Sequence, residues 1–257
     1  DIVLTGNDPW FYRYWVDQTV AAGGLLDVSG LADLPPGITG GEPLLVAVLW
    51  VFTAILGGSE TASGVVLVFY PIVAAVLVGL LTYVFTWELT DDRRIAVMAV
   101  AILAVLPVHA QRSGLGYADH HAFDFVWLTL TAASAVYTTK LPAVRDRLEE
   151  RPWHLILGAC GVGGGVAGQT LAWEAGPLLL VPLVLYFPIV ALLNAREARS
   201  PFWASAPLLA GLGAGGLLTA PARLGLGWPS PFLASAPAIV FGCRAGGTPL
   251  PTGTYRS

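Results

Sequence analysis

Residues 64–85 read GVVLVFYPIVAAVLVGLLTYVF, and this stretch decides the fold class. A helix needs about 20 mostly apolar residues to cross the hydrocarbon core of a bilayer, and this stretch carries no charge. The composition of the 257-residue chain agrees, because 55% of the residues are hydrophobic, only 12% are charged, and the mean hydropathy is +0.69. Such values are far from those of an average soluble domain. The sequence therefore predicts an all-α, polytopic bundle of transmembrane helices.

Further apolar segments follow the first. The predicted spans are residues 64–85, 95–110, 122–139, 153–172, 177–193 and 202–220. Prolines interrupt the apolar run after Trp228, so a seventh span there stays open. Residues 44–56 are also apolar, but so short a segment is more typical of a helix that lies in the membrane interface or dips into it.

Basic residues cluster in three short loops between these spans. They are Arg93 and Arg94 in the first loop, Lys140, Arg145, Arg147 and Arg151 in the second, and Arg196 and Arg199 in the third. If residues 44–56 do not cross, all three loops lie on one side, as the positive-inside rule requires of cytoplasmic loops. Residues 1–63 are then an extracytoplasmic loop with a short interfacial helix, and residues 64–257 are the transmembrane helical region. Residues 111–121 return to the outer face.

Two polar segments of that outer face carry the candidate chemistry. One is GNDPW (residues 6–10), and the other is RSGLGYADHHAFD (residues 112–124). Asp8, Asp119 and His121 offer two carboxylates and an imidazole, a set of oxygen and nitrogen donors that suits a divalent cation. Asp119 and His121 are two residues apart, so they point to the same side of an extended segment.

Each of these features also has a purely structural interpretation. Asp8 before Pro9 fits an ordinary turn, and Asp119 at the start of a helix fits an N-cap. Arg112 is either an interfacial anchor or the partner of a carboxylate or a lipid phosphate. Asp124 lies inside the membrane boundary, where ionisable groups usually face a cavity or a partner. Because the two segments share one face, we favour the site over the structural alternatives.

The same segments resemble a known family. Residues 6–9, GNDP, are similar to the first aspartate motif of the oligosaccharyltransferase catalytic subunit family, multispanning glycosyltransferases of GT-C-type architecture that modify asparagine. Residues 112–121 resemble its second motif, Arg…Gly-aromatic-x-Asp-x-Asp, whose last place can be His in archaeal members of the AglB type. Trp173, at the outer end of a span, resembles a Trp that the family places there.

The resemblance implies roles for individual residues. Asp8 and Asp119 would be catalytic, and together with His121 they would bind Mg²⁺ or Mn²⁺, with Zn²⁺ an alternative because His121 replaces the usual Asp. Arg112 would be the phosphate or carboxylate partner. Weaker candidates for the site are His120, Asp124 and Glu174.

The implied reaction transfers an oligosaccharide from a polyprenyl (dolichyl) phosphate or diphosphate carrier to the Asn of Asn-x-Ser/Thr sequons. The expected partners are the lipid-linked oligosaccharide, the acceptor polypeptide and membrane lipid, and no nucleic acid. The expected location is the plasma membrane, with an extracytoplasmic active site. The family's first span, a later outer loop with a Glu, and its Trp-Trp-Asp-Tyr-Gly motif are not in this sequence, so we expect a fragment that is truncated at both ends and inactive alone.

Two other functions are weighed against this one. Another membrane glycosyltransferase that uses polyprenyl-phosphate sugars would need an acidic residue in the first outer loop but not the second motif. A transporter would place ionisable residues along a path at the midplane, whereas here they lie at the outer boundary. Residues 163–168, GGGVAG, match the spacing of a nucleotide-binding loop, but inside a span they favour close helix packing.

Overall fold

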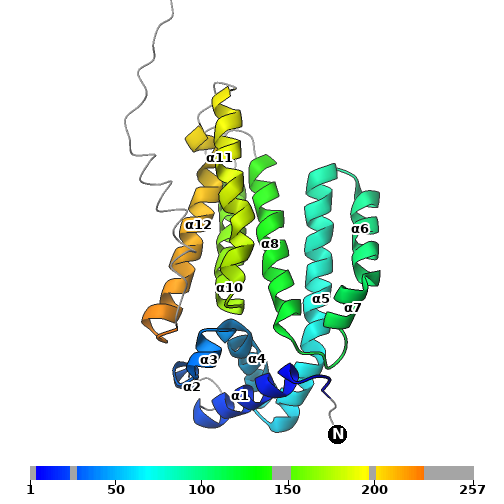
Figure 1. Ribbon diagram of the computed structural model, residues 1–257, viewed down its shortest axis with the longest axis vertical. Coiled ribbons are helices and arrows are strands. Elements are labelled where there is room, and N and C mark those ends of the chain that lie inside the picture. Colours follow the sequence, from blue (N-terminus) through cyan, green and yellow to red (C-terminus); the bar gives the residue numbers. More distant parts are fainter. Residues whose placement is uncertain (1–3, 24–27, 141–151, 197–200, 229–257) are drawn as a thin grey trace, which may run out of the picture.

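The computed structural model describes residues 4–23, 28–140, 152–196 and 201–228. This part of the chain is helical and contains no strand, which confirms the all-α class (Figure 1). The helices are α1 (Asp8–Gly23), α2 (Ser29–Ala32), α3 (Pro36–Thr39), α4 (Pro43–Ile55), α5 (Glu60–Thr90), α6 (Arg93–Val105), α7 (Pro107–Arg112), α8 (His120–Lys140), α10 (Pro152–Ala172), the 3-10 helix η1 (Gly176–Leu180), α11 (Val181–Arg196) and α12 (Pro201–Leu224).

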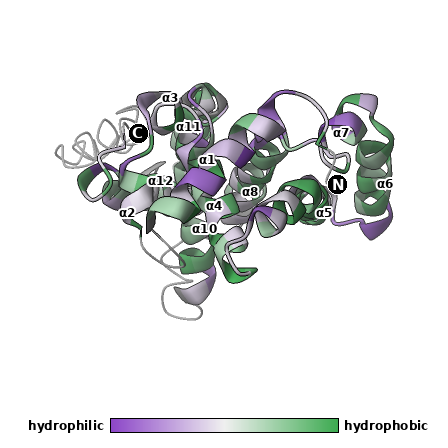
Figure 2. Ribbon diagram, turned by 90° about the horizontal axis from the view of Figure 1, so that it is seen from below, coloured by the Kyte–Doolittle hydropathy of each residue, from purple (hydrophilic) through white to green (hydrophobic). Residues whose placement is uncertain are grey.

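The long helices form a bundle, and α1 to α4 form a layer across one end of it (Figure 1). The chain leaves the layer along α5, returns along α6, leaves again along α8 and returns along α10, and α11 and α12 repeat this path. Within the bundle, α5 packs against α6 and α8, α8 packs against α10, and α10 packs against α12. Seen from the side of the layer, hydrophobic ribbon dominates α5 and α6, while hydrophilic segments gather in α1 and around α7 (Figure 2).

Three of the predicted spans coincide with helices that are long and apolar enough to cross a membrane. These helices are Glu60–Thr90, Trp153–Ala172 and Ser205–Leu224. α11 is a shorter apolar helix of 16 residues. α8 has 21 residues but carries polar side chains along its length.

The predicted span 95–110 is wrong as one continuous helix. The helix α6 has 13 residues, and α7 follows as a separate short helix. Between them Leu106 is extended, with φ −64° and ψ 122°, because the ring of Pro107 disfavours the helical conformation of the residue before it. Pro107 itself lacks the N–H that a continuous helix would use.

The core of the layer is apolar and ties it to the bundle. Val16 of α1, Ile38 of α3 and Leu45 of α4 are fully buried, and they share one hydrophobic cluster with Leu67 of α5. α4 also contacts α10, so the layer rests on both α5 and α10.

The predicted short helix at residues 44–56 corresponds to α4, which runs across the bundle end instead of along it (Figure 1). Its thirteen residues reach only about 20 Å at ~1.5 Å each. Phe52 and Ile55 are exposed on its outer face, and they line an open apolar groove of about 460 Å³ together with residues of α5 and α8. The location of α4 in a membrane interface stays a prediction.

The basic clusters lie at the opposite end of the bundle from the layer, as far as the structure describes them. Arg93 and Arg94 begin α6, Lys140 ends α8 and Arg196 ends α11, all at the end remote from α1–α4 (Figure 1). The remaining members, Arg145, Arg147, Arg151 and Arg199, lie outside the described residues.

Candidate metal centre

Main-chain hydrogen bonds bring the two polar segments together. The N–H of Thr5 donates to the carbonyl of Gly116 at 3.0 Å, and the N–H of Gly116 donates to the carbonyl of Val68 in α5 at 3.1 Å. Gly116 has φ +73°, a left-handed conformation that glycine adopts without the strain of a side chain. The first and second segments therefore lie side by side, although about 110 residues separate them.

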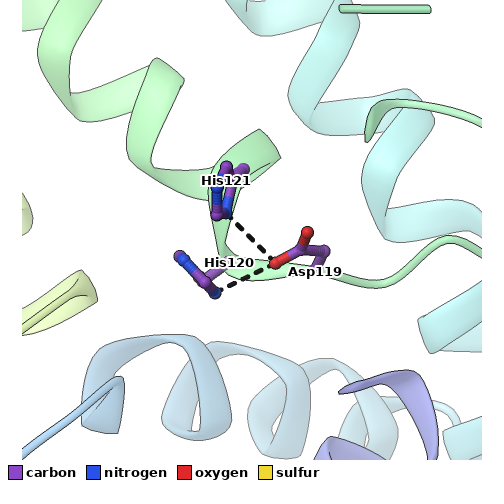
Figure 3. Close-up of side chains that lie close together, drawn as sticks. All are labelled: Asp119, His120 and His121. Carbon is purple, nitrogen blue, oxygen red and sulfur yellow. Dashed lines mark ion pairs between the residues drawn. The ribbon is translucent and has the colours of Figure 1, made fainter. Parts of the chain in front are cut away.

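Asp119 is the centre of the site. Its side chain is only 1% exposed, at the last position before α8. One carboxylate oxygen, Oδ2, pairs with the guanidinium of Arg112, and the backbone carbonyl of Asp119 accepts a hydrogen bond from the hydroxyl of Tyr70. The other oxygen, Oδ1, faces two imidazoles, with Nδ1 of His120 at 2.9 Å and Nδ1 of His121 at 3.3 Å (Figure 3).

These three side chains have the geometry of a metal-binding cluster. The ligand atoms of Asp119, His120 and His121 all lie within 4.8 Å of one another. Oδ1 of Asp119 and Nδ1 of His121 are buried, and neither has a hydrogen-bond partner of acceptable geometry in the described part of the chain. Buried polar atoms without partners are rare, and a cation between them would satisfy both. An oxygen with one or two imidazole nitrogens is a donor set that fits Zn²⁺ and other divalent metals.

The electrostatics favour a charged carboxylate beside a neutral imidazole. Burial alone would raise the pKa of Asp119, but contact with His120 and the charges of His121 and Arg112 hold that pKa well below its usual range. The pKa of His121 is lowered, first by burial and then by the charge of His120. Burial also opposes the charge of His120, but Asp119 and other nearby carboxylates raise its pKa. His121 is therefore the better prepared metal ligand, since metals bind the neutral ring.

His120 is enclosed by residues of three other segments. The indole of Trp173, just after α10, stacks on its ring with centroids 5.9 Å apart and planes at 24°. Its Nδ1 also lies 3.6 Å from Oε1 of Glu42 and 3.5 Å from the hydroxyl of Tyr12 in α1. Sequence reasoning did not find Glu42 or Tyr12. The signal for Glu42 was a carboxylate directly before Pro43, at the start of an apolar helix assigned to the same face.

Asp8 is brought to the same side but not into the cluster. It is exposed at the start of α1, and its carboxylate is not among the atoms within 4.8 Å of one another. Tyr12, one helical turn further along α1, makes the contact with His120. Burial raises the pKa of both Tyr12 and Glu42, and the negative charge of Asp8 adds to this rise. The Asp8 carboxylate therefore lies at the margin of the site. Its role as a ligand stays a prediction.

The weaker candidates surround the cluster. Asp124 is 6% exposed in the first turns of α8, and its Oδ1 has no hydrogen-bond partner among the described residues. Glu174 is exposed after α10, beside the turn at Gly41 that precedes α4. Burial raises the pKa of Glu42, and the negative charge of Glu174 raises it further. Asp8, Glu42, Asp119, Asp124 and Glu174 thus make this end of the bundle strongly acidic, which favours cations.

Comparison with known proteins finds similar sequences. Residues 3–152 match the family model described as Oligosaccharyl transferase STT3, N-terminal. Dolichyl-phosphooligosaccharide-protein glycotransferase 3 of Archaeoglobus fulgidus is 31% identical over 199 residues, which are 73% of this chain and 22% of that protein. Glycotransferase 1 of the same organism is 26% identical over 68% of this chain and 28% of that protein. The chain thus spans about a quarter of the length of these relatives.

Two solved structures share the fold. The crystal structure of the Archaeoglobus fulgidus oligosaccharyltransferase in complex with Zn and sulfate aligns with a TM-score of 0.74 at 23% identity, over 93% of this chain and 31% of that one. The archaeal oligosaccharyltransferase AglB from the same organism, in complex with an inhibitory peptide and a dolichol-phosphate, aligns with a TM-score of 0.69 at 22% identity, over 93% and 29%. The predicted GT-C-type architecture is confirmed.

Proposed function

Since the chain belongs to the oligosaccharyl transferase STT3 family, we propose that it carries part of the active site of an enzyme that glycosylates asparagine. The reaction transfers an oligosaccharide from a polyprenyl (dolichyl) phosphate or diphosphate carrier to Asn in Asn-x-Ser/Thr sequons. One observation carries the proposal: the buried carboxylate of Asp119 keeps one oxygen directed at two imidazoles, beside the segment that holds Asp8.

The chemistry of the acceptor explains why such a site is needed. An amide nitrogen is a poor nucleophile because its lone pair is delocalised into the carbonyl group. A carboxylate that accepts a hydrogen bond from the amide N–H polarises it, and Asp8, exposed at the edge of the cluster, is placed for that contact. A divalent cation supplies charge neutralisation for the phosphate that leaves.

The residues of this chain would hold that cation and keep its site in shape. Asp119 and His121 would ligate it through Oδ1 and Nδ1, and Asp8 would complete the set. Arg112 fixes Asp119 through Oδ2 and offsets its charge. We expect Mg²⁺ or Mn²⁺ in the cell, with Zn²⁺ the alternative that imidazole ligation favours.

We also propose the location of the site. The acidic end of the bundle would face the extracytoplasmic side of the plasma membrane, because the described basic loop residues lie at the other end (Figure 1). There the site would meet the lipid-linked oligosaccharide from the membrane and the acceptor polypeptide from outside.

The two rival functions fit the site less well. A glycosyltransferase without the second motif would not need the pair of Asp119 and Arg112 or the two imidazoles beside it. A transporter would place these groups halfway along the bundle. Instead they lie where α8 begins, directly beside the layer of α1–α4 (Figures 1 and 3).

The test is a transfer assay with a lipid-linked oligosaccharide and a sequon peptide, on the protein expressed from its complete gene. Asp8→Asn and Asp119→Asn should each abolish transfer, because each removes a carboxylate charge and keeps the shape of the side chain. Asp33→Asn, an exposed control at the end of α2, should leave transfer unchanged. Full activity of either site variant would contradict the assignment.

A further inference from the structure

One ring nitrogen in the site faces two carboxylates. Nδ1 of His120 lies 2.9 Å from Oδ1 of Asp119 and 3.6 Å from Oε1 of Glu42. Glu42 lies directly before α4, about 77 residues earlier in the chain than Asp119. Its side chain is 15% exposed, so it is held inside the protein and not in open solvent.

A cation at the cluster would change which carboxylate His120 can use. Oδ2 of Asp119 is already paired with Arg112, so a cation has to bind Oδ1, the same oxygen that faces Nδ1 of His120. An oxygen that ligates a cation is a weaker acceptor, and the charge of the cation repels an N–H that points toward it. An Nδ1–H of His120 would then need another acceptor, unless this nitrogen itself ligates the cation.

Glu42 is placed to be that acceptor. It directly precedes Pro43 at the N-terminus of α4, and the buried Leu45 in the next turn fixes the position of this helix. The hydroxyl of Tyr12 in α1 lies 3.5 Å from the same ring nitrogen, so Tyr12 and Glu42 both face Nδ1 of His120. Trp173 stacks on one face of the His120 ring.

We propose that Glu42 is a positioning residue that accepts the Nδ1–H of His120 when a cation occupies Oδ1 of Asp119. By holding His120, it leaves His121 as the imidazole ligand of the pair. The assignment rests on the metal centre of the proposed function. It gives the two adjacent histidines different roles, in agreement with their surroundings. Tyr12 of α1 and Glu42 before α4 contact His120, whereas the side chain of His121 is 38% exposed.

The experiment is X-ray absorption spectroscopy on the purified protein loaded with one equivalent of Zn²⁺, which counts imidazole ligands. Glu42→Ala should gain one imidazole relative to the wild type, because His120 loses its acceptor and joins the metal. Glu42→Gln should keep the wild-type count, since the amide oxygen still accepts the N–H. Glu88→Gln, in the last turn of α5 at the other end of the bundle, is the matched control and should not change the count.

The double variant Glu42→Ala/His120→Ala identifies the added ligand and should return to the wild-type count. The proposal is overturned if Glu42→Ala leaves the count unchanged, or if His120→Ala alone lowers it. Failure of the wild type to bind zinc through Asp119 would overturn both this proposal and the metal centre. Normal coordination without transfer to a sequon peptide would count against the proposed function alone and leave the role of Glu42 supported.

Discussion

At the scale of single residues, the site depends on how Asp119 divides its two oxygens. Arg112 takes Oδ2, and this leaves Oδ1 as the one oxygen directed at the imidazoles. A buried carboxylate would be costly without a partner, so Arg112 makes the burial of Asp119 tolerable. The same pair orients the oxygen that would bind the cation, as outer-shell partners of metal ligands generally do.

Asp119→Asn should therefore weaken Zn²⁺ binding more than Arg112→Gln does. Loss of an outer-shell partner costs roughly 10–100-fold in metal affinity, and we expect that range for Arg112→Gln and a larger loss for Asp119→Asn. Competition with a chromophoric chelator measures both, with the exposed Asp33→Asn as the control. Equal affinities of all three variants and the wild type would show that zinc binds elsewhere.

The sequence predicted part of this site. Asp119, His120, His121 and Arg112 stand close together in the chain, and the structure places them in contact. The sequence could place Glu42 on the same face, directly before Pro43, but it could not indicate the contact with His120, which forms only in the folded chain. Such a contact is set by the packing of the layer and leaves no spacing pattern in the sequence.

At the scale of helices, glycines determine how closely the bundle packs. A Cβ atom on Gly165 of α10 would lie 2.2 Å from Oγ1 of Thr131 in α8, and one on Gly163 would lie 2.8 Å from the carbonyl of Gly211 in α12. Neither distance is tolerable, so α10 contacts both neighbours through its glycines. Gly163 faces α12 and Gly165 faces α8, which agrees with the interpretation of residues 163–168 as a packing segment.

Gly165→Ala should destabilise the protein, and Gly164→Ala should not. The first change forces α8 and α10 apart at the Thr131 backbone, an overpacking that costs about 1–3 kcal/mol. A Cβ on Gly164 meets nothing within 4 Å, and alanine raises helix propensity there. Thermal unfolding in detergent compares the two variants. Equal unfolding temperatures would mean that the contact with Thr131 does not set the helix spacing.

Helix ends were harder to predict than helices. The apolar run 64–85 has the length that a membrane crossing needs, but α5 extends over 31 residues. Residues outside the run determine where this helix begins and ends. Ser59 caps its first turn by accepting a hydrogen bond from the N–H of Ala62, and Asp91 ends it in a left-handed conformation with φ 54°. Hydropathy therefore located three of the spans, and for α5 the capping residues outside the apolar run set the helix limits.

At the scale of the whole molecule, the candidate site and the described basic loop residues occupy opposite ends of the bundle. The candidate site and the layer of α1–α4 lie at one end, and Arg93, Arg94 and Arg196 lie at the other (Figure 1). Positive loops remain in the cytoplasm during insertion, so this separation predicts the orientation of the chain.

Reporter fusions test that orientation. A reporter that is active only in the cytoplasm should give signal when fused after Arg94 and none when fused after Gly116. The reason is that Arg94 lies at the start of α6, and the length of this helix separates it from the end of the bundle where Gly116 hydrogen-bonds to Val68. Signal from the Gly116 fusion would place the site in the cytoplasm. The site could then not reach acceptor polypeptides outside the cell, and the proposed location would be wrong.

The hydrogen bond from Thr5 to Gly116 joins two segments that the ribosome synthesises at different times. The ribosome adds ~5–20 residues per second, so the second partner emerges roughly 6–22 s after the first. During that interval the first segment has already left the ribosome and waits without its partner, while α5, α6 and α7 are still being inserted. The site can therefore assemble only after α5, α6 and α7 have been placed in the correct order and orientation.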